Sequence, residues 1–488
     1  MTETFDVLIV GAGPTGDVLA ALLGQAGVKT LLTDKSPSIY PLPRAAHIDH
    51  ETVRVFQQAG VADAVMAVSR PAEQYDFLTT DGQVLLRFLT KGSPSGWPTA
   101  NMIHQPSVEA AVRARLAALD DVELRVGWEL LDYQLSAAGV VARFQTAEGE
   151  RTVTARYLVG ADGASSRVRT LSGATFEDLQ FDEPWLVIDT IVQDFSRLPD
   201  INLQICDPAR PTTCVLMGSG RHRWEFMLKP EETAEQATDD AFIAELLKAW
   251  NVEGAVTLER KAVYRFHALI AHQWRFGNVF LAGDAAHQTP PFAGQGLCAG
   301  VRDAANLAWK LAAVLKGEAD EALLDTYQAE RRPHVKSIIE LALMMGRTVC
   351  ILDPAAAEGR NAAMLAQRAA APPEQAGQGV SFPAFTGPLV VEGSAAAGEL
   401  FIQPWSEGAR WDDVAGEGAW LITTEAVGPE PGLALFSLSD ARAAPFAGAF
   451  QSWLDKRGAA SVLVRPDRYV FGTGKAEDLV KAWKIALG

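Results

Sequence analysis

The first 34 residues change their hydrophobic pattern three times. Residues 5–10 form a nearly continuous apolar run, which predicts a buried strand. A glycine-rich turn follows over residues 11–16, and an apolar pattern with helical spacing opens at Pro14. Residues 29–33 form a second strand-like run that ends at Asp34. Strand, tight turn, helix and strand in this order predict a parallel βαβ unit.

Helical and strand patterns alternate through the rest of the chain. Helical spacing covers residues 46–70 and 108–119, and strand spacing covers 76–88, 122–159 and 176–266. A short apolar strand at 279–282 precedes a long helix that we expect to end near Gly317. Residues 353–379 are rich in Ala, Pro, Gln and Gly, which predicts a linker, and regular patterns resume from residue 381.

Composition and charge narrow the function classes. The 488 residues carry a net charge of −17, which argues against a nucleic-acid partner and against an anionic membrane surface. The four cysteines show no Cys-x-x-Cys pair and no zinc-like spacing, so neither a disulfide framework nor a metal site is predicted. The first residues do not resemble a signal peptide, and no apolar run is long enough to span a bilayer. We therefore expect a soluble, cytoplasmic protein.

The turn at residues 11–16 contains three glycines with the spacing Gly-x-Gly-x-x-Gly. In a βαβ unit, Gly11 permits the tight turn, Gly13 lets the backbone approach a pyrophosphate, and Gly16 lets helix and strand pack closely. The helix that opens at Pro14 supplies free N–H groups and the positive end of its dipole. Asp34 lies 23 residues after Gly11, close to the roughly 20 expected for an acid that binds ribose hydroxyls. These features predict a dinucleotide site.

Two further strands end in acidic motifs. Residues 157–161 lead into Asp162-Gly163, and residues 279–282 lead into Gly283-Asp284. Each motif alone has an ordinary explanation, because Asp-Gly is a common turn and Asp284 could cap a helix. A second glycine-rich segment, residues 294–296, follows at the start of the predicted long helix.

In this order and spacing, these motifs resemble the group A flavoprotein monooxygenases, the aromatic hydroxylases built like 4-hydroxybenzoate hydroxylase. The resemblance implies that Asp284 binds the flavin ribityl chain, and that Asp162 and Gly163 take part in both FAD and NAD(P)H binding. The backbone from Gly294 to Leu297 would direct N–H groups at the flavin's pyrimidine edge. A helix start stabilises the negative charge that the reduced flavin carries there.

Other segments are similar to the 3-(3-hydroxyphenyl)propionate hydroxylase branch of that family. They cover residues 43–49, 103–106, 290–296, 302–311 and 327–332, so the resemblance extends from about residue 5 to about residue 345. It implies that Arg44 and Gln105 contact FAD, with Arg44 near the pyrophosphate and the isoalloxazine path. The cofactor-binding residues that we expect are Gly11, Gly13, Pro14, Gly16, Asp34, Lys35, Arg44, Gln105, Asp162, Gly163, Gly283, Asp284, Pro291, Gly294, Gln295, Gly296 and Leu297.

The predicted fold class is α/β, with interleaved domains. A Rossmann-type FAD-binding domain (1–75, 105–175 and 262–350) alternates with an α+β substrate domain (76–104 and 176–261). A linker (351–380) leads to a C-terminal domain (381–488) that resembles the thioredoxin-like tail of several family members, notably over residues 462–470. This domain lacks redox cysteines, so we expect it to be structural or oligomer-forming, for example in a homodimer, and dispensable for chemistry.

Two features bear on cofactor binding. Position 17 is apolar or neutral in most of these enzymes, but here Asp17 lies in the first turn of the phosphate-binding helix. A carboxylate there gains about 0.3–1 kcal/mol from the helix dipole, yet it would repel a pyrophosphate unless its side chain points away. A second Gly-x-Gly-x-x-Gly in a strand–helix setting is not found, so NADH or NADPH is expected to bind transiently.

The resemblance implies that NAD(P)H reduces FAD, that O₂ adds to the reduced flavin, and that an electron-rich ring attacks the resulting hydroperoxide. Because a phenolate is a better nucleophile than a phenol, we expect a base near the substrate hydroxyl. His47 is the first candidate, since a histidine titrates near pH 6.5, and a purely packed or solvent-facing role is its alternative. We expect His287 to orient its loop, and the role of His104 is open.

The substrate is less well defined by the sequence. The resemblance favours a small phenolic compound that is hydroxylated ortho to an existing hydroxyl. Hydroxylation of a larger fused-ring polyketide is one alternative, and a flavin-binding sensor without turnover is another. A carboxylate-bearing phenol would require an arginine, for which Arg210, Arg221 and Arg223 are available.

Overall fold

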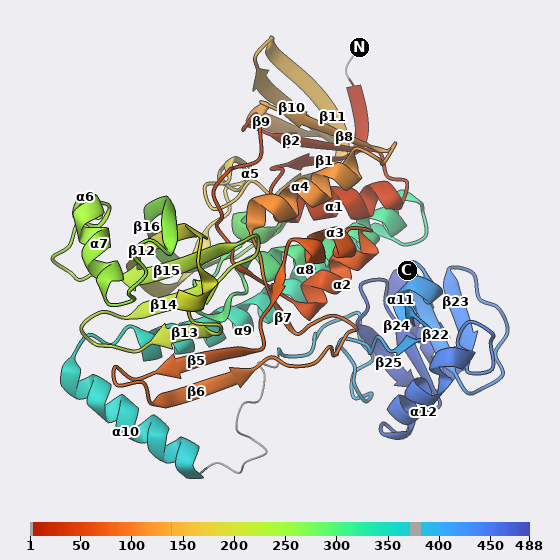
Figure 1. Cartoon of the computed structure of the whole chain (residues 1–488). Helices are drawn as coiled ribbons and strands as arrows, with labels where there is room; N and C mark the ends of the chain where they lie inside the picture. The colour runs from red at the N-terminus through yellow and green to blue at the C-terminus, as the bar shows by residue number, and fades with distance from the viewer. Residues whose placement is uncertain (1–2, 138, 371–381) are drawn as a thin grey trace.

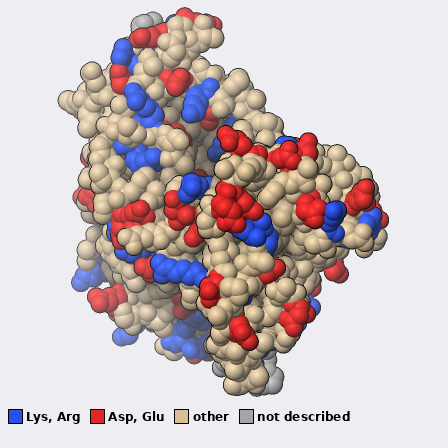
Figure 2. Space-filling view, turned by 90° about the vertical axis from the view of Figure 1, so that its left-hand side faces the viewer, with Lys and Arg blue, Asp and Glu red and all other residues tan. Residues whose placement is uncertain are grey.

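Three main sheets organise the chain in the computed structural model, which describes residues 3–137, 139–370 and 382–488 (Figure 1). Two of these sheets have eight strands each, and the third is a four-stranded sheet in the C-terminal domain. None of the helices in these ranges is both long and apolar enough to cross a membrane. Figure 2 shows Lys and Arg interspersed with Asp and Glu over one face, so the basic residues drawn there do not form a continuous stripe.

The first sheet is built around the predicted βαβ unit. Its order is β17-β18-β11-β1-β2-β8, with β9 and β10 extending antiparallel from β11, and β1 pairs in parallel with both β2 and β11. Val7, Leu8 and Ile9 have no exposed surface, because the core packs on both faces of this sheet. The strands are β1 (Glu3–Val10), β2 (Thr30–Asp34), β8 (Val122–Val126), β9 (Glu129–Ser136), β10 (Gly139–Thr146), β11 (Gly149–Gly160), β17 (Arg275–Phe276) and β18 (Val279–Leu281).

Helices and a small sheet surround this first sheet. Helix α8 packs beside α1, which also contacts α4 (Figure 1). The helices are α1 (Pro14–Gln25), α2 (His50–Gln58), α3 (Ala62–Ala67), α4 (Gln105–Leu116), α5 (Arg167–Ser172), α8 (Gly296–Leu315) and α9 (Asp325–Val349), with short 3-10 turns η2 (Gly283–Ala285), η3 (Pro291–Ala293) and η4 (Glu321–Leu324). The small sheet has the order β3 (His47–Asp49), β7 (Ala100–Met102), β4 (Arg70–Pro71).

The second sheet has the order β19-β16-β12-β15-β14-β13-β5-β6. Its strands are β5 (Gln74–Leu78), β6 (Val84–Leu89), β12 (Phe176–Val192), β13 (Asn202–Ile205), β14 (Thr212–Leu216), β15 (Arg221–Met227), β16 (Val256–Ala271) and β19 (His287–Gln288), and η1 (Phe195–Arg197) follows β12. The strand-rich prediction for this region missed two helices, α6 (Ala234–Ala237) and α7 (Asp240–Lys248). A capping box from Thr233 to Gln236 and an N-cap at Asp239 are their sequence signals.

The predicted linker over residues 351–380 contains a helix that its composition was not expected to form, and its role as a linker stays a prediction. Residues 354–370 form α10 (Pro354–Ala370), and residues 371–380 of the expected linker lie outside the described residues. Pro354 opens the helix, Asp353 accepts a hydrogen bond from the N–H of Ala356 at 2.7 Å, and alanine dominates the interior. Alanine is the strongest helix former, so an alanine-rich segment with an N-terminal proline favours helix over loop.

The C-terminal domain is built on a mixed four-stranded sheet with the order β23-β22-β24-β25. Alternate residues of β22 face two separate cores, with Trp420 and Ile422 in one and Leu421 in the other. The elements are β20 (Trp405–Ser406), β21 (Ala409–Arg410), α11 (Trp411–Ala415), β22 (Ala419–Thr423), β23 (Leu433–Ser437), η6 (Ala444–Phe446), α12 (Ala447–Asp455), β24 (Ser461–Val464), β25 (Val470–Gly474) and α13 (Ala476–Leu487). The thioredoxin-like classification stays a prediction.

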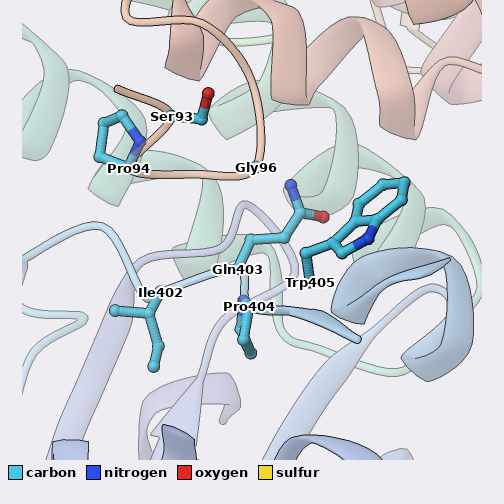
Figure 3. A pocket seen from close by; sticks show the side chains of 7 residues that line it. All are labelled: Ser93, Pro94, Gly96, Ile402, Gln403, Pro404 and Trp405. Carbon is cyan, nitrogen blue, oxygen red and sulfur yellow. The ribbon is translucent and has the colours of Figure 1, made fainter. Parts of the chain in front are cut away.

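Buried polar contacts join this domain to the rest of the chain. Arg54 of α2 pairs with Asp412, and Glu330 of α9 pairs with Arg465. All four side chains are buried. A cavity of about 520 Å³ lies at the same junction, between the 93–96 loop and residues 402–405 (Figure 3). The expectation of a separable tail therefore needs revision, because truncation would leave buried charges without partners.

Candidate active site

The glycine turn at the end of β1 has the geometry that a dinucleotide requires. A Cβ atom at Gly16 would overlap the carbonyl oxygen of Gly11, and Gly11 itself has a φ of +108°. A Cβ at Gly13 would meet nothing within 4 Å, so no protein neighbour explains the glycine there. Helix α1 has no side-chain cap, and its first N–H groups are free to bind phosphate oxygens. The turn therefore fits the pyrophosphate of FAD.

Asp34 lies at the end of β2, beside this turn. One carboxylate oxygen accepts a hydrogen bond from the N–H of Ala12 at 2.8 Å, and the other accepts from the N–H of Ser36 at 2.7 Å. These bonds hold the carboxylate against the glycine turn and leave it lone pairs for ribose hydroxyls. Lys35, the next predicted residue, is exposed.

Asp17 is directed away from solvent. Its side chain is fully buried, and one carboxylate oxygen lies 3.2 Å from Nε of Arg113 on α4. Burial raises the pKa of Asp17 well above its usual value, although Arg113 opposes that shift. Arg113 also donates to the carbonyl oxygen of Ala12. Because the carboxylate is buried and paired with Arg113, we expect its cost to FAD binding to be small.

The two acidic motifs differ in what their carboxylates contact. Asp162 accepts hydrogen bonds from Ser166 Oγ at 2.5 Å and from the N–H groups of Arg167 and Val168 at 2.6 and 3.1 Å, so it holds the start of α5. Asp284 is exposed and has no hydrogen-bond partner in the described part of the chain. Although its side chain is exposed, the protein atoms packed around the carboxyl group desolvate it and raise the pKa of Asp284 above its usual value. Asp284 is thus the free acceptor of the two.

A buried network fixes the backbone next to Asp284. Asp303 accepts from the N–H of Gly283 at 3.0 Å, lies 2.6 Å from Nε2 of His287, and pairs with Arg331 at 2.8 Å. All three side chains in this network have no exposed surface. His287 and the N–H of Gly283 share the carboxylate of Asp303, which agrees with the expectation that His287 orients the loop around Asp284.

The start of α8 lies beside His47 of β3. Gly294 has a φ of +63°, and its carbonyl oxygen is 3.1 Å from Nδ1 of His47. Helix α8 begins after Gln295 without a side-chain cap, so the first N–H groups, including those of Gly296 and Leu297, are free for a ligand. Pro291 belongs to η3, directly before this segment. A 20-residue helix that starts uncapped fits the anionic edge of a reduced flavin.

The contact with Gly294 fixes the protonation of His47. A carbonyl oxygen can only accept, so Nδ1 must carry the proton and Nε2 is left as an acceptor. Burial lowers the pKa of His47, which keeps the ring neutral at pH 7. By contrast, His104 is held by Ser107 at 2.8 Å, and its Nε2 is buried without a partner in the described part of the chain. A neutral His47 can accept a proton through Nε2.

The Arg44 segment is held from two sides. Gln105 accepts a hydrogen bond from the N–H of Ala45 at 2.7 Å, and Arg223 of the second sheet donates to the carbonyl oxygen of Arg44 at 2.7 Å. The Arg44 side chain is exposed, with its guanidinium 4.8 Å from the ring centre of Tyr40. Gln105 therefore shapes this segment through the backbone, while the Arg44 side chain is free to bind a ligand.

The three arginines that could bind a substrate carboxylate are already paired with acidic side chains. Arg223 donates two hydrogen bonds to the buried Asp189. Burial alone would lower the pKa of Arg223, but the ion pair with Asp189 outweighs it and leaves the pKa raised. A paired guanidinium has little capacity left for a substrate anion. The pairs are Arg210 with Glu232 at 2.6 Å, Arg221 with Glu259 at 2.7 Å, and Arg223 with Asp189 at 2.6 Å.

Sequence reasoning missed Arg113 and Arg302. Arg113 neutralises Asp17, and Arg302 contacts Gln295 at the start of α8. Arg113 and Asp17 are 96 residues apart, and the other partner of Arg302, Asp49, lies 253 residues away, so a local motif could not have revealed these pairings.

The chain matches the family described as FAD binding domain over residues 4–342, and the family described as HcaD C-terminal domain over residues 444–486. It belongs to the FAD binding domain family, and it is an FAD-dependent aromatic monooxygenase that draws on NAD(P)H and O₂. This confirms the predicted class and its cofactors.

Two relatives are similar over much of the chain. A probable NADH-specific resorcinol 4-hydroxylase of Rhodococcus jostii (strain RHA1) is 37% identical over 98% of this chain and 95% of its own length. A 3-(3-hydroxy-phenyl)propionate/3-hydroxycinnamic acid hydroxylase of Comamonas testosteroni is 40% identical over 76% of this chain and 63% of its own length. Among solved structures, the flavin-dependent monooxygenase PieE in complex with FAD and substrate has a TM-score of 0.83 at 23% identity, with 99% of each chain covered. That likeness shows the fold alone.

Proposed function

We propose that the enzyme hydroxylates an uncharged, single-ring phenol ortho to an existing hydroxyl, with His47 as the base. Bound FAD would supply the redox chemistry, accepting hydride from NAD(P)H and transferring one oxygen atom of O₂ to the ring. The observation that carries the proposal is the contact of His47 Nδ1 with the Gly294 carbonyl, which leaves Nε2 as a proton acceptor beside the start of α8.

The remaining residues would bind and orient the cofactor. The α1 start, with Gly13, would hold the pyrophosphate and Asp34 a ribose, because free N–H groups and a fixed carboxylate lie side by side there. Asp284 would accept from the ribityl chain, since its carboxylate is exposed and unpartnered within the described residues. Asp162 and Gly163 would lie near both FAD and the transient NAD(P)H.

The paired arginines support an uncharged substrate. Arg210, Arg221 and Arg223 each pair with an acidic side chain, so a substrate carboxylate would have to displace a formed ion pair. The names of the two relatives differ in this property, because resorcinol is uncharged and the phenylpropionate carries a carboxylate. We therefore propose a resorcinol-type substrate and NADH as the donor. Both relatives are named for single-ring compounds, so the fused-ring alternative is not favoured.

A substrate panel tests this function. Resorcinol, 3-(3-hydroxyphenyl)propionate and a fused-ring phenol are each added to the enzyme with NADH or NADPH, and product mass is recorded together with cofactor oxidation. We expect stimulated NADH oxidation and a product heavier by one oxygen atom with resorcinol. Failure of every phenol to stimulate oxidation would overturn the proposed activity, whereas preference for the phenylpropionate would overturn only the uncharged substrate.

The cellular setting is also a proposal. A reaction that consumes NAD(P)H needs access to that pool, which supports a cytoplasmic location. A homodimer is proposed as the assembly, and light scattering of the purified enzyme would test it.

A further inference from the structure

Arg302 is buried between three polar groups that come from two other parts of the site. Its Nη2 donates to Asp49 Oδ2 at 2.5 Å, its Nε lies 2.9 Å from Glu51 Oε2, and its Nη1 donates to Gln295 Oε1 at 3.0 Å. Asp49 ends β3, two residues after His47, and Gln295 directly precedes α8. One guanidinium therefore links the His47 strand to the start of α8.

Two carboxylates, those of Asp49 and Glu51, face the single guanidinium of Arg302. The hydroxyl of Tyr469, in the C-terminal domain, donates a hydrogen bond to Glu51 Oε1. Tyr469 is buried, and its ring stacks on Phe385 with the ring centres 3.9 Å apart. A buried carboxylate needs such a donor, because no water replaces a lost hydrogen bond there.

The Gln295 side chain does not cap the helix that it precedes. A residue that precedes a helix commonly caps the first N–H groups with its side chain, but Gln295 makes no such bond. Its amide oxygen accepts from Arg302 instead. The contact with Arg302 therefore fixes the residue before α8 while leaving the first N–H groups of the helix unoccupied.

We propose that the C-terminal domain supports the cofactor site, because the Tyr469 hydroxyl holds Glu51, and Glu51 and Arg302 together hold Gln295 at the start of α8. Tyr469 is then a positioning residue for the segment that receives the flavin. The inference rests on the proposed function in one respect, the placement of the flavin's pyrimidine edge at the start of α8.

The matched control is another buried contact between the same two regions. Arg54 of α2 donates to both carboxylate oxygens of Asp412 at 2.9 and 2.7 Å, and within the described part of the chain neither residue contacts Arg302 or Gln295. If the C-terminal domain merely had to remain attached, loss of this ion pair should matter more than loss of one hydroxyl. If Tyr469 positions the start of α8, loss of its hydroxyl should weaken FAD binding more than loss of the Arg54–Asp412 ion pair.

The test is FAD titration of the full-length apoprotein, followed by flavin fluorescence. We expect Tyr469→Phe to weaken FAD binding by about tenfold, the size of one buried hydrogen bond to a charged group. Asp412→Asn should bind FAD within about twofold of the wild type. A wild-type dissociation constant for Tyr469→Phe, or equal weakening in both variants, would overturn the proposal.

A double-mutant cycle separates positioning from general loosening. Gln295→Ala removes the acceptor for Arg302, so Tyr469→Phe should add little further loss in that background, whereas independent effects would multiply. Multiplicative losses would overturn the proposal. If Tyr469→Phe does not fold, Glu51→Ala breaks the same link from the other side and must show the same non-additivity. A wild-type chain that binds no FAD would instead contradict the proposed function itself.

Discussion

The two helix starts that we propose as the cofactor site are built in different ways. At α1, the backbone of residues 11–16 forms the turn, and Asp34 completes it from the next strand. At α8, Asp49 of β3 and Glu51 of α2 contact Arg302, which holds Gln295, and Tyr469 of the C-terminal domain donates to Glu51. Both helices begin without a side-chain cap. The comparison shows that an uncapped helix start can be encoded by local sequence or assembled from segments that are distant in sequence.

The largest expected effect falls on the locally encoded start. In Gly16→Ala the new Cβ would overlap the Gly11 carbonyl, so we expect the βαβ unit to be disrupted and FAD binding to be lost. Gly13→Ala is the matched control, because its Cβ would meet no protein atom within 4 Å. That variant should melt like the wild-type apoprotein yet bind FAD at least about tenfold more weakly, since the methyl group occupies the pyrophosphate approach.

Thermal unfolding of the two apoproteins and FAD titration give both quantities. Wild-type FAD affinity in Gly13→Ala would show that the pyrophosphate does not bind at this turn. A normally folded Gly16→Ala variant would show that helix and strand can separate there at little cost.

The second prediction concerns His47, which contacts the segment just before α8. His47→Ala should leave FAD binding and hydride transfer nearly intact but slow oxygen insertion by roughly 10²–10⁴, the usual contribution of a general base. The variant should release hydrogen peroxide in place of product. A higher pH should partly restore coupling, because the phenol then ionises without assistance.

The control for this variant is His50→Ala on the same segment, where the ring contacts Ser95 at 2.9 Å instead of Gly294. Product and peroxide are quantified for both variants across pH. Coupling in His47→Ala equal to that of the wild type at neutral pH would leave His47 a structural role, and His104 would become the next candidate.

The two helix starts also differ in how much of them the sequence could reveal. The roles of Gly11, Gly16 and Asp34 follow from spacing within 23 residues, because turn geometry and helix packing are local. Arg302 and Asp49 are 253 residues apart, and Tyr469 and Glu51 are 418 apart. No periodicity reports which buried charges will meet once the domains pack together.

The missed helix α10 has a different cause. Its alanines and glutamine are also typical of linkers, although the local propensity of alanine favours a helix. That error was avoidable from the sequence, while the contacts of Arg302 and Tyr469 required the tertiary structure.

The smallest effect concerns the stability of the junction behind α8. Glu330 of α9 has no exposed surface and pairs with Arg465 at 2.5 Å and Lys310 at 2.7 Å. Burial alone would raise the pKa of Glu330, but Arg465 and Lys310 lower it to about 2. A carboxyl with a depressed pKa stabilises the fold above its unfolded pKa and loses that contribution as pH falls. Stability should therefore decline between about pH 4.5 and pH 2, by up to about 3 kcal/mol for this group.

Urea midpoints at pH 7 and pH 3 test this sign. Glu330→Gln should be destabilised at pH 7, because it leaves buried cations without their carboxylate, and should lose less than the wild type on acidification. Glu340→Gln, on the exposed face of the same helix, is the control and should follow the wild type at both pH values. Equal acid sensitivity in wild type and Glu330→Gln would mean that Glu330 is not the titrating group. Attachment of the C-terminal domain would then have to depend on its other buried pairs, of which Arg54 with Asp412 is the first to test.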